Sequence, residues 1–188
     1  MVDRTAGVDR EVARACSPLA GAVTISETDA YGALVAMFVK NGLEFSEEEA
    51  ERAKHTIPAD IVKCYEAVEM FAGCDGASDS ADGNARAGRL IGGCVLAVRE
   101  GSFIIDGIAA EPEYREIKLG KKMLEMAVNE AKSRGANELF LVARAPDFFR
   151  KQGFVAVSRE DAPNFFECFT CPQYNTSCFP EVMRLRWR

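Results

Sequence analysis

Apolar positions recur along the chain with two periods, one typical of helices and one typical of strands. The clearest helical pattern covers residues 119–134, where apolar side chains return every three or four positions and charged side chains fall mostly opposite. A second helix is expected over 27–41, with Thr28 or Ser26 as its cap and Gly42 as its stop. Ser46 and Glu49 have the spacing of a capping box, which predicts a short acidic helix to about residue 54.

Strand patterns account for most of the remaining chain. Strands are expected at 22–26, within 61–72, and at 90–99, 102–110, 137–143, 153–157 and 182–187, with a short helix at 146–151. The junction Glu100-Gly101 predicts a tight hairpin between two of these strands. This order predicts an α+β (α/β three-layer) fold in which helices flank a mixed, mostly antiparallel sheet.

The domain organisation follows from where the patterns stop. Residues 1–19 have weak periodicity and are expected to form a loose N-terminal segment, with 20–188 as a single domain. The tract 73–89 has no large apolar side chain, so it is expected to be a flexible loop, with an interdomain linker as the alternative. A cysteine-rich tail occupies residues 165–180.

Composition narrows the class of protein. The chain has 188 residues, of which 48% are hydrophobic, enough for one sizeable core. A formal net charge of −6 argues against general nucleic-acid binding. No apolar run is long enough for a membrane span, and charges near the start leave no signal peptide. Seven cysteines, an odd number, favour reduced thiols, so we expect a cytoplasmic protein.

A local excess of positive charge precedes the best helix. Arg115, Lys118, Lys121 and Lys122 surround the point where that helix begins, and Gly120 lets the backbone approach a ligand. Unpaired N–H groups and the positive end of the helix dipole converge at such a point. The residues therefore predict an anion site that suits a phosphate-bearing ligand, with a solvated helix start as the alternative.

Two segments resemble the signatures of the GNAT acyl-CoA-dependent N-acetyltransferases. IAAEPEYREIKLGKKML resembles their cofactor loop: Arg115 and Gly120 match, while Lys118 stands where a glycine is expected. APDFFRKQGF resembles a second signature, with Phe149 in place of a tyrosine. The resemblance covers roughly residues 22–157 in element order and is specific over 103–154.

The resemblance implies a GNAT-like fold and transfer of an acetyl group from acetyl-CoA to a primary amine of a small molecule or amino acid. In the family, a bulged strand pairs with the pantetheine arm and the loop binds the diphosphate. The implied cofactor-binding residues are Ile108, Ala109, Ala110, Arg115, Glu116, Lys118, Leu119, Gly120, Lys121 and Phe149. The alternative is a degenerate GNAT fold that binds acyl-CoA without turnover, because Lys118 and Phe149 depart from the pattern. The family also implies a homodimer.

The proton-transfer groups are left open by the sequence. Asp106 is a candidate base, with an ordinary hairpin carboxylate as the alternative. Phe149 lacks the hydroxyl that protonates the leaving thiolate in many members, and Tyr114 and Tyr174 are unranked substitutes. An acidic run at 44–51 suits a cationic acceptor, but nearby Lys and Arg residues suit an acidic one equally.

The tail places Cys168, Cys171 and Cys178 within eleven residues. A C-x2-C pair is half of a common zinc site, so a structural zinc ion is one interpretation; reactive thiols and plain packed thiols are the others. FFRKQGF, Ala162-Pro163 and Tyr174-Asn175 are also similar to N-acetylglutamate synthase catalytic domains. Because the arginine-rich stretch of those domains is absent, this similarity does not specify glutamate as the acceptor.

Overall fold

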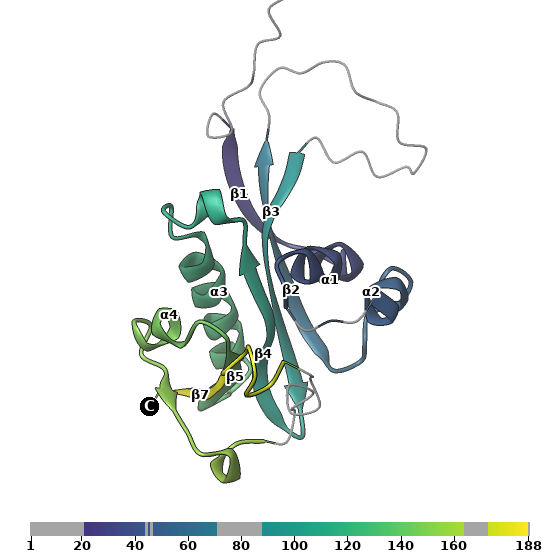
Figure 1. Cartoon of the computed structure of the whole chain (residues 1–188). Coiled ribbons are helices and arrows are strands. Elements are labelled where there is room, and N and C mark those ends of the chain that lie inside the picture. Colours follow the sequence, from purple (N-terminus) through teal and green to yellow (C-terminus); the bar gives the residue numbers. More distant parts are fainter. Residues whose placement is uncertain (1–20, 44, 46, 71–87, 164–172, 188) are drawn as a thin grey trace, which may run out of the picture.

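The strands of the chain form one sheet with helices packed on both faces (Figure 1). A computed structural model describes residues 21–43, 45, 47–70, 88–163 and 173–187. The elements, in chain order, are β1 (Ala22–Glu27), α1 (Tyr31–Lys40), α2 (Glu47–Ala53), β2 (Ile61–Met70), β3 (Gly88–Arg99), β4 (Ser102–Ala110), the 3-10 turn η1 (Pro112–Tyr114), α3 (Leu119–Ser133), β5 (Glu138–Ala143), α4 (Pro146–Arg150), β6 (Val155–Ala156), the 3-10 turn η2 (Arg159–Asp161) and β7 (Glu181–Arg186).

The seven described strands lie in the order β1-β2-β3-β4-β5-β7-β6. Every neighbouring pair is antiparallel except β4 and β5, which are parallel because α3 connects them as a crossover. The predicted mixed, mostly antiparallel sheet flanked by helices is therefore confirmed.

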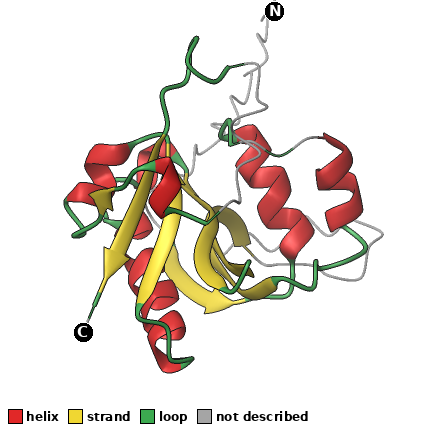
Figure 2. Cartoon of the chain, turned by 90° about the horizontal axis from the view of Figure 1, so that it is seen from below, coloured by secondary structure: helices red, strands yellow, loops and turns green. Residues whose placement is uncertain are grey.

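Two adjacent glycines on β3 let helices approach both faces of the sheet. A Cβ atom at Gly92 would lie 3.0 Å from Met123 on α3, and one at Gly93 would lie 2.6 Å from Leu34 on α1. Successive strand residues point to opposite faces, so the pair brings α1 and α3 close on either side. Figure 2 shows the sheet between these helices, with α2 beside α1 and α4 beside the far end of the sheet.

A bulge and an early end to pairing shape β4. Val95 pairs with Gly107 and Leu96 with Ile105, so Asp106 is an extra residue on β4 with no counterpart on β3. Toward β5, pairing covers only Ile104 and Ile105 among the described residues. Beyond Ile105 the two parallel strands diverge, and the rest of β4 has a free edge.

The strand and helix predictions hold with shifted ends, but the predicted cap of α1 is wrong. The helix begins at Tyr31 without a side-chain cap, because β1 continues to Glu27, where it still pairs with β2. Thr28 instead accepts a hydrogen bond from the backbone N–H of Ala30, ahead of the helix. Gly42 ends the helix at φ +73° as expected.

Several other expectations are settled only in part. The hairpin turn at Glu100-Gly101 is present, and both residues have positive φ. Gly88 and Arg89, expected to end the flexible loop, belong to β3. Residues 1–19, residues 73–87, Ser46 and the first half of the tail (165–172) lie outside the described residues. In the part of the chain that the structure describes, no helix is long and apolar enough to cross a membrane.

Candidate functional site

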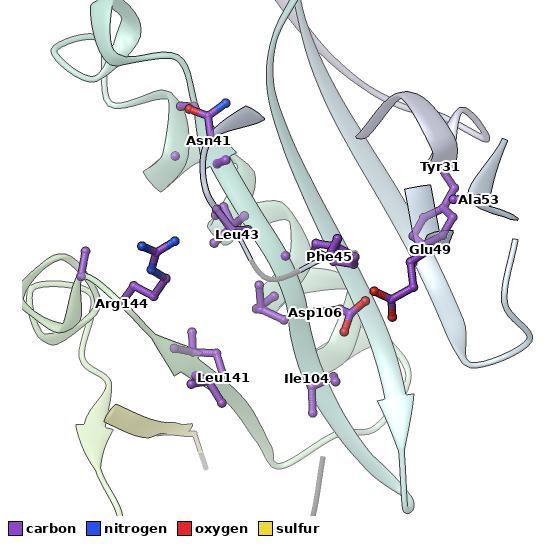
Figure 3. Close-up of a pocket in the computed structure, with 18 of the residues that line it drawn as sticks. Tyr31, Asn41, Leu43, Phe45, Glu49, Ala53, Ile104, Asp106, Leu141 and Arg144 are labelled. Carbon is purple, nitrogen blue, oxygen red and sulfur yellow. The ribbon is translucent and has the colours of Figure 1, made fainter. Parts of the chain in front are cut away.

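A cavity of about 1140 Å³ opens where β4 and β5 diverge. Its walls come from both faces of the sheet: Leu43 and Phe45 of the α1–α2 connection line it, and so do Gly120 of α3 and Phe148 of α4. The cavity therefore passes between the separated strands. Figure 3 shows the part of it under the α1–α2 connection.

One end of the cavity carries positive charge at the start of α3. Arg115, Lys118, Gly120 and Lys121 line it, and neither an acidic residue nor a side-chain cap occupies the first turn of this 15-residue helix. Lys118 adopts the left-handed conformation, with φ +59°. It therefore takes the backbone conformation typical of glycine, the residue that the family pattern has at this position. The unpaired N–H groups of the helix start, with these cations, suit a phosphate group.

The middle of the cavity is a strand edge. Ile108, Ala109 and Ala110 line it; each pairs with β3 on one side, and none pairs with β5 in the described structure. Backbone N–H and C=O groups on such an edge are ready to bond an extended ligand. Because these groups alternate between the two sides of a strand, every second residue directs its N–H and C=O across the gap that the diverging β5 leaves.

The other end of the cavity holds a network of charged side chains. Arg99 contacts Asp60 through Nε at 2.9 Å and Asp106 through Nη2 at 2.7 Å. The Asp106 side chain is only 7% exposed, yet it lines the cavity at the β4 bulge. Burial, and then the negative charge of Asp106, raise the pKa of the nearby Tyr31 phenol well above its usual value. Tyr31, also on the cavity wall, therefore keeps its proton at neutral pH and can donate a hydrogen bond there.

Comparison with known proteins now decides the family of this site. Residues 80–156 match the family model of the acetyltransferase (GNAT) domain. The chain carries a GNAT acetyltransferase domain. The matched range runs from β3 through α3, β5 and α4, so it holds the loop, the bulge and the diverging strands.

Two curated relatives match parts of the GNAT domain. An amino-acid acetyltransferase of Pseudomonas fluorescens is 34% identical over 77 residues, which is 40% of this chain and 18% of that protein. An uncharacterised N-acetyltransferase of Chlorobaculum tepidum is 27% identical over 89 residues, which is 46% of this chain and 57% of that protein. The chain thus spans little more than half of one relative and less than a fifth of the other.

Solved structures share the fold across most of the chain. A GNAT-family acetyltransferase of Staphylococcus aureus has a TM-score of 0.59 at 16% identity, covering 89% of this chain and 100% of that one. N-acetylglutamate synthase of Neisseria gonorrhoeae, solved with coenzyme A and N-acetyl-glutamate, has a TM-score of 0.54 at 17% identity, covering 88% of this chain and 35% of that one. At these identities the likeness concerns the GNAT fold alone.

Phe149 has a packing role in the GNAT domain. Its side chain is 6% exposed, and its ring meets Phe148 and Phe154 edge to face at centroid distances of 4.9 and 5.7 Å. It also lines the cavity, so it offers an apolar contact.

Four other predicted site residues lie away from the cavity wall of the GNAT domain. Tyr114 is 1% exposed, and its hydroxyl donates a 2.5 Å hydrogen bond to the buried carboxylate of Glu69. Leu119 points into the core, and Glu116 is exposed outside the cavity. Tyr174 belongs to a turn in which it bridges Cys178. The side chains of these four residues therefore do not line the cavity.

Only one of the three cysteines of the predicted zinc site lies among the described residues. Cys168 and Cys171 lie outside the described residues, and Cys178 is a half-buried free thiol. Among the residues that are described, no three His, Cys, Asp or Glu side chains are grouped to hold a metal ion. The described residues thus give the metal interpretation no support.

Sequence reasoning missed several residues of the site. Tyr31 and Asn41 stood in an ordinary helix pattern, and Arg144 followed a buried strand without any motif of its own; all three line the cavity. Arg99 gave no signal either, because its role depends on Asp60, which is 39 positions away. Only the fold brings these side chains to one place.

Proposed function

We propose that this chain is an N-acetyltransferase that moves an acetyl group from acetyl-CoA to a primary amine of a small molecule or amino acid. The observation that carries the proposal is the cavity between the diverging β4 and β5. It joins an uncapped, cationic helix start at one end to a buried carboxylate, Asp106, at the other.

The residues along the cavity suit acetyl-CoA in one direction. Arg115, Lys118 and the first N–H groups of α3 would hold the diphosphate. The free edge of Ile108–Ala110 would pair with the amides of the pantetheine arm. This direction places the thioester near the β4 bulge. The similar fold of the gonococcal synthase, solved with coenzyme A, supports this placement.

The reaction is a direct attack. The neutral amine nitrogen forms a bond to the thioester carbonyl carbon, the C–S bond then breaks, and CoA leaves as its thiolate. A backbone N–H group at the bulge stabilises the negative charge on the carbonyl oxygen. Asp106 accepts the proton that the nitrogen loses, while its bond to Arg99 fixes its orientation. With phenylalanine at 149, the thiolate leaves without a tyrosine proton donor at that position.

The acceptor class is supported by the other end of the cavity. Carboxylates there suit an amine, and the apolar rings of Phe45 and Tyr31 limit its size. The name of the Pseudomonas relative, an amino-acid acetyltransferase, supports the same class.

Two measurements test the proposal. Acetyl-CoA should raise the melting temperature of the protein, and CoA thiol should appear when an amine panel is added. Gly120→Asp should weaken acetyl-CoA binding, because it places a negative charge beside the diphosphate; Gly120→Ala is the matched control, since its Cβ would lie no closer than 3.5 Å to Phe148. Stabilisation by acetyl-CoA without any turnover would favour the alternative, a degenerate GNAT fold that binds acyl-CoA without turnover. No stabilisation would refute both the acetyltransferase and this alternative.

A further inference from the structure

Three arginines on the cavity wall have no ion-pair partner among the described residues. They are Arg52 on α2, Arg115 ahead of α3, and Arg144 between β5 and α4. In contrast, Arg99 is neutralised by Asp60 and Asp106, and Lys121 lies 3.6 Å from Glu125. Arg115 and Lys118 stand at the helix start that suits the diphosphate. The positive charges of Arg52 and Arg144 are therefore left for another anion.

Arg144 is the better placed of the two for an acceptor. Its Nη1 would lie 3.3 Å from a Cβ atom at Gly42, so its guanidinium reaches from the end of β5 to the α1–α2 connection. In Figure 3 it extends toward Asn41 and Leu43, over the gap between β4 and β5. Glycine at position 42 leaves room for it there.

The register of the sheet relates Arg144 to Asp106. Ile105 pairs with Leu141, so Asp106 is one residue past this pair on β4 and Arg144 is three residues past it on β5. At ~3.3 Å per residue the two positions differ by about 7 Å along the strands. A flexible arginine side chain can cover part of that distance, so both charges can contact one small molecule.

The wall between the two charges is apolar. Leu43 and Leu141 line the cavity there, and Figure 3 shows them between Arg144 and Asp106. Apolar walls exclude water and strengthen the attraction between a guanidinium and a bound carboxylate. A ligand with an amine at one end and a carboxylate at the other matches this order of groups.

We propose that Arg144 selects the acceptor by binding its carboxylate, so that the substrate is a free amino acid and not a peptide N-terminus, an amide or a polyamine. This inference rests on the proposed acetyl transfer. Arg144 is assigned as a specificity-determining residue, with Asn41 beside it on the same wall. The guanidinium holds the carboxylate while the amine lies toward Asp106 and the thioester.

The test compares L-amino acids with their α-carboxamides as acceptors. An amide has the lower amine pKa, so more of it is neutral, and a preference for the acid cannot come from the nucleophile. The wild-type protein should prefer the acid. Arg144→Ala should raise the KM of the acid by about 10- to 100-fold and leave the amide unchanged. Arg144→Lys should retain part of the preference, because it keeps the charge but loses the paired donors.

Two controls and one binding measurement keep the test decisive. Arg134→Ala removes an exposed arginine that pairs with Glu130 outside the cavity, and it should change nothing. Arg52→Ala should leave the preference for the acid intact. If turnover is too slow to measure, calorimetry of the amino acid and its amide with CoA-saturated protein gives the same comparison.

Several results would overturn the inference. The wild type could use acids and amides equally, or Arg144→Ala could raise the KM of both equally. Arg52→Ala, in place of Arg144→Ala, could abolish the preference for the acid. Finally, Arg144→Ala could raise the KM of acetyl-CoA, which would assign the guanidinium to the cofactor. Acetylation of amides or polyamines alone would refute the inference and leave the proposed function standing. Acetyl transfer to no amine at all would refute the proposed function.

Discussion

Arg99 contacts two carboxylates at once, and this limits what Asp106 can do. With Nη2 of Arg99 at 2.7 Å from its Oδ1, the Asp106 carboxylate is held in one orientation at the cavity wall. In the proposed reaction, Asp106 therefore meets the amine in one fixed position, where it accepts the proton that the nitrogen loses.

Asp106→Asn should lower kcat by about 10²-fold, the lower end of the range for general-base groups. The affinity for acetyl-CoA should stay unchanged, because Asp106 lies at the opposite end of the cavity from the diphosphate site. Single-turnover rates and calorimetry measure the two effects separately. Asp60→Asn is the control, since it also alters a partner of Arg99 but leaves the cavity carboxylate in place. An Asp106→Asn protein with wild-type kcat would exclude the assigned role.

Tyr114 stabilises the protein through a buried hydrogen bond. Burial, and then its bond to Glu69, raise the pKa of Tyr114 from 10.0 to about 12. The unfolded chain loses the phenol proton first, so this contribution is complete below pH 10 and is lost as the pH rises toward 12. Its hydroxyl supports the turn that leads to the α3 loop.

Tyr114→Phe should lower the free energy of unfolding by about 1–3 kcal/mol at pH 8, because the buried Glu69 carboxylate loses its donor. The difference from wild type should shrink between pH 8 and pH 11, since only the wild type loses the tyrosine contribution. Urea denaturation at several pH values measures it. A difference that stays constant up to pH 11 would show that Tyr114 does not have the assigned pKa shift.

At the scale of elements, the start of α3 combines a strained backbone with a useful charge. Lys118 sits at φ +59°, a conformation that costs a side-chain-bearing residue about 1–2 kcal/mol relative to glycine. The family pattern has glycine at this position. The lysine keeps the glycine-like backbone and adds an ammonium group beside the proposed diphosphate.

Lys118→Gly should raise the free energy of unfolding by about 1 kcal/mol and weaken acetyl-CoA binding several-fold, because strain and charge are removed together. Lys118→Ala separates the two effects: it should weaken binding equally and give no gain in stability. Thermal denaturation and calorimetry measure both quantities. Unchanged acetyl-CoA affinity in both variants would mean that the ammonium group does not contact the cofactor.

The contact between α1 and β4 depends on Gly107, which leaves room for the Phe38 ring. A Cβ atom at Gly107 would lie 2.6 Å from the Phe38 ring. Gly107→Ala should therefore destabilise the protein by about 1–3 kcal/mol through overpacking. Gly120→Ala, where the nearest atom is 3.5 Å away, should be close to neutral in the same denaturation experiment. Equal stability of the two variants would contradict this packing.

Local patterns predicted most elements, and their ends were decided by pairing. The amphipathic spacing of α3 and the Glu100-Gly101 turn depend on neighbouring residues, so both were predictable. The start of α1 was not, because the pairing of Glu27 with Tyr65 extends β1 at the expense of the helix. The site divides in the same way. The α3 loop is a local motif, whereas the contacts of Arg99 and the place of Arg144 depend on distant chain segments.

For the whole molecule, the net charge of −6 conceals an ordered charge pattern inside one cavity. Positive groups at the start of α3, a carboxylate at the β4 bulge and a guanidinium at the end of β5 line the same space. This sequence of charges suits the proposed acetyl-CoA at one end and the proposed amino-acid acceptor at the other. Cofactor binding, reaction and acceptor choice would then depend on three segments of one wall.

The most direct test of acetyl transfer is product analysis with acetyl-CoA that carries an isotopic label in its acetyl group. The protein is incubated with a mixture of amino acids, their amides and polyamines, and the amines are examined by mass spectrometry. We predict labelled N-acetyl amino acids from the wild type, and far less from Gly120→Asp at the same acetyl-CoA concentration. Absence of any labelled amine above the level formed without protein would contradict the assignment of this chain as an acetyltransferase.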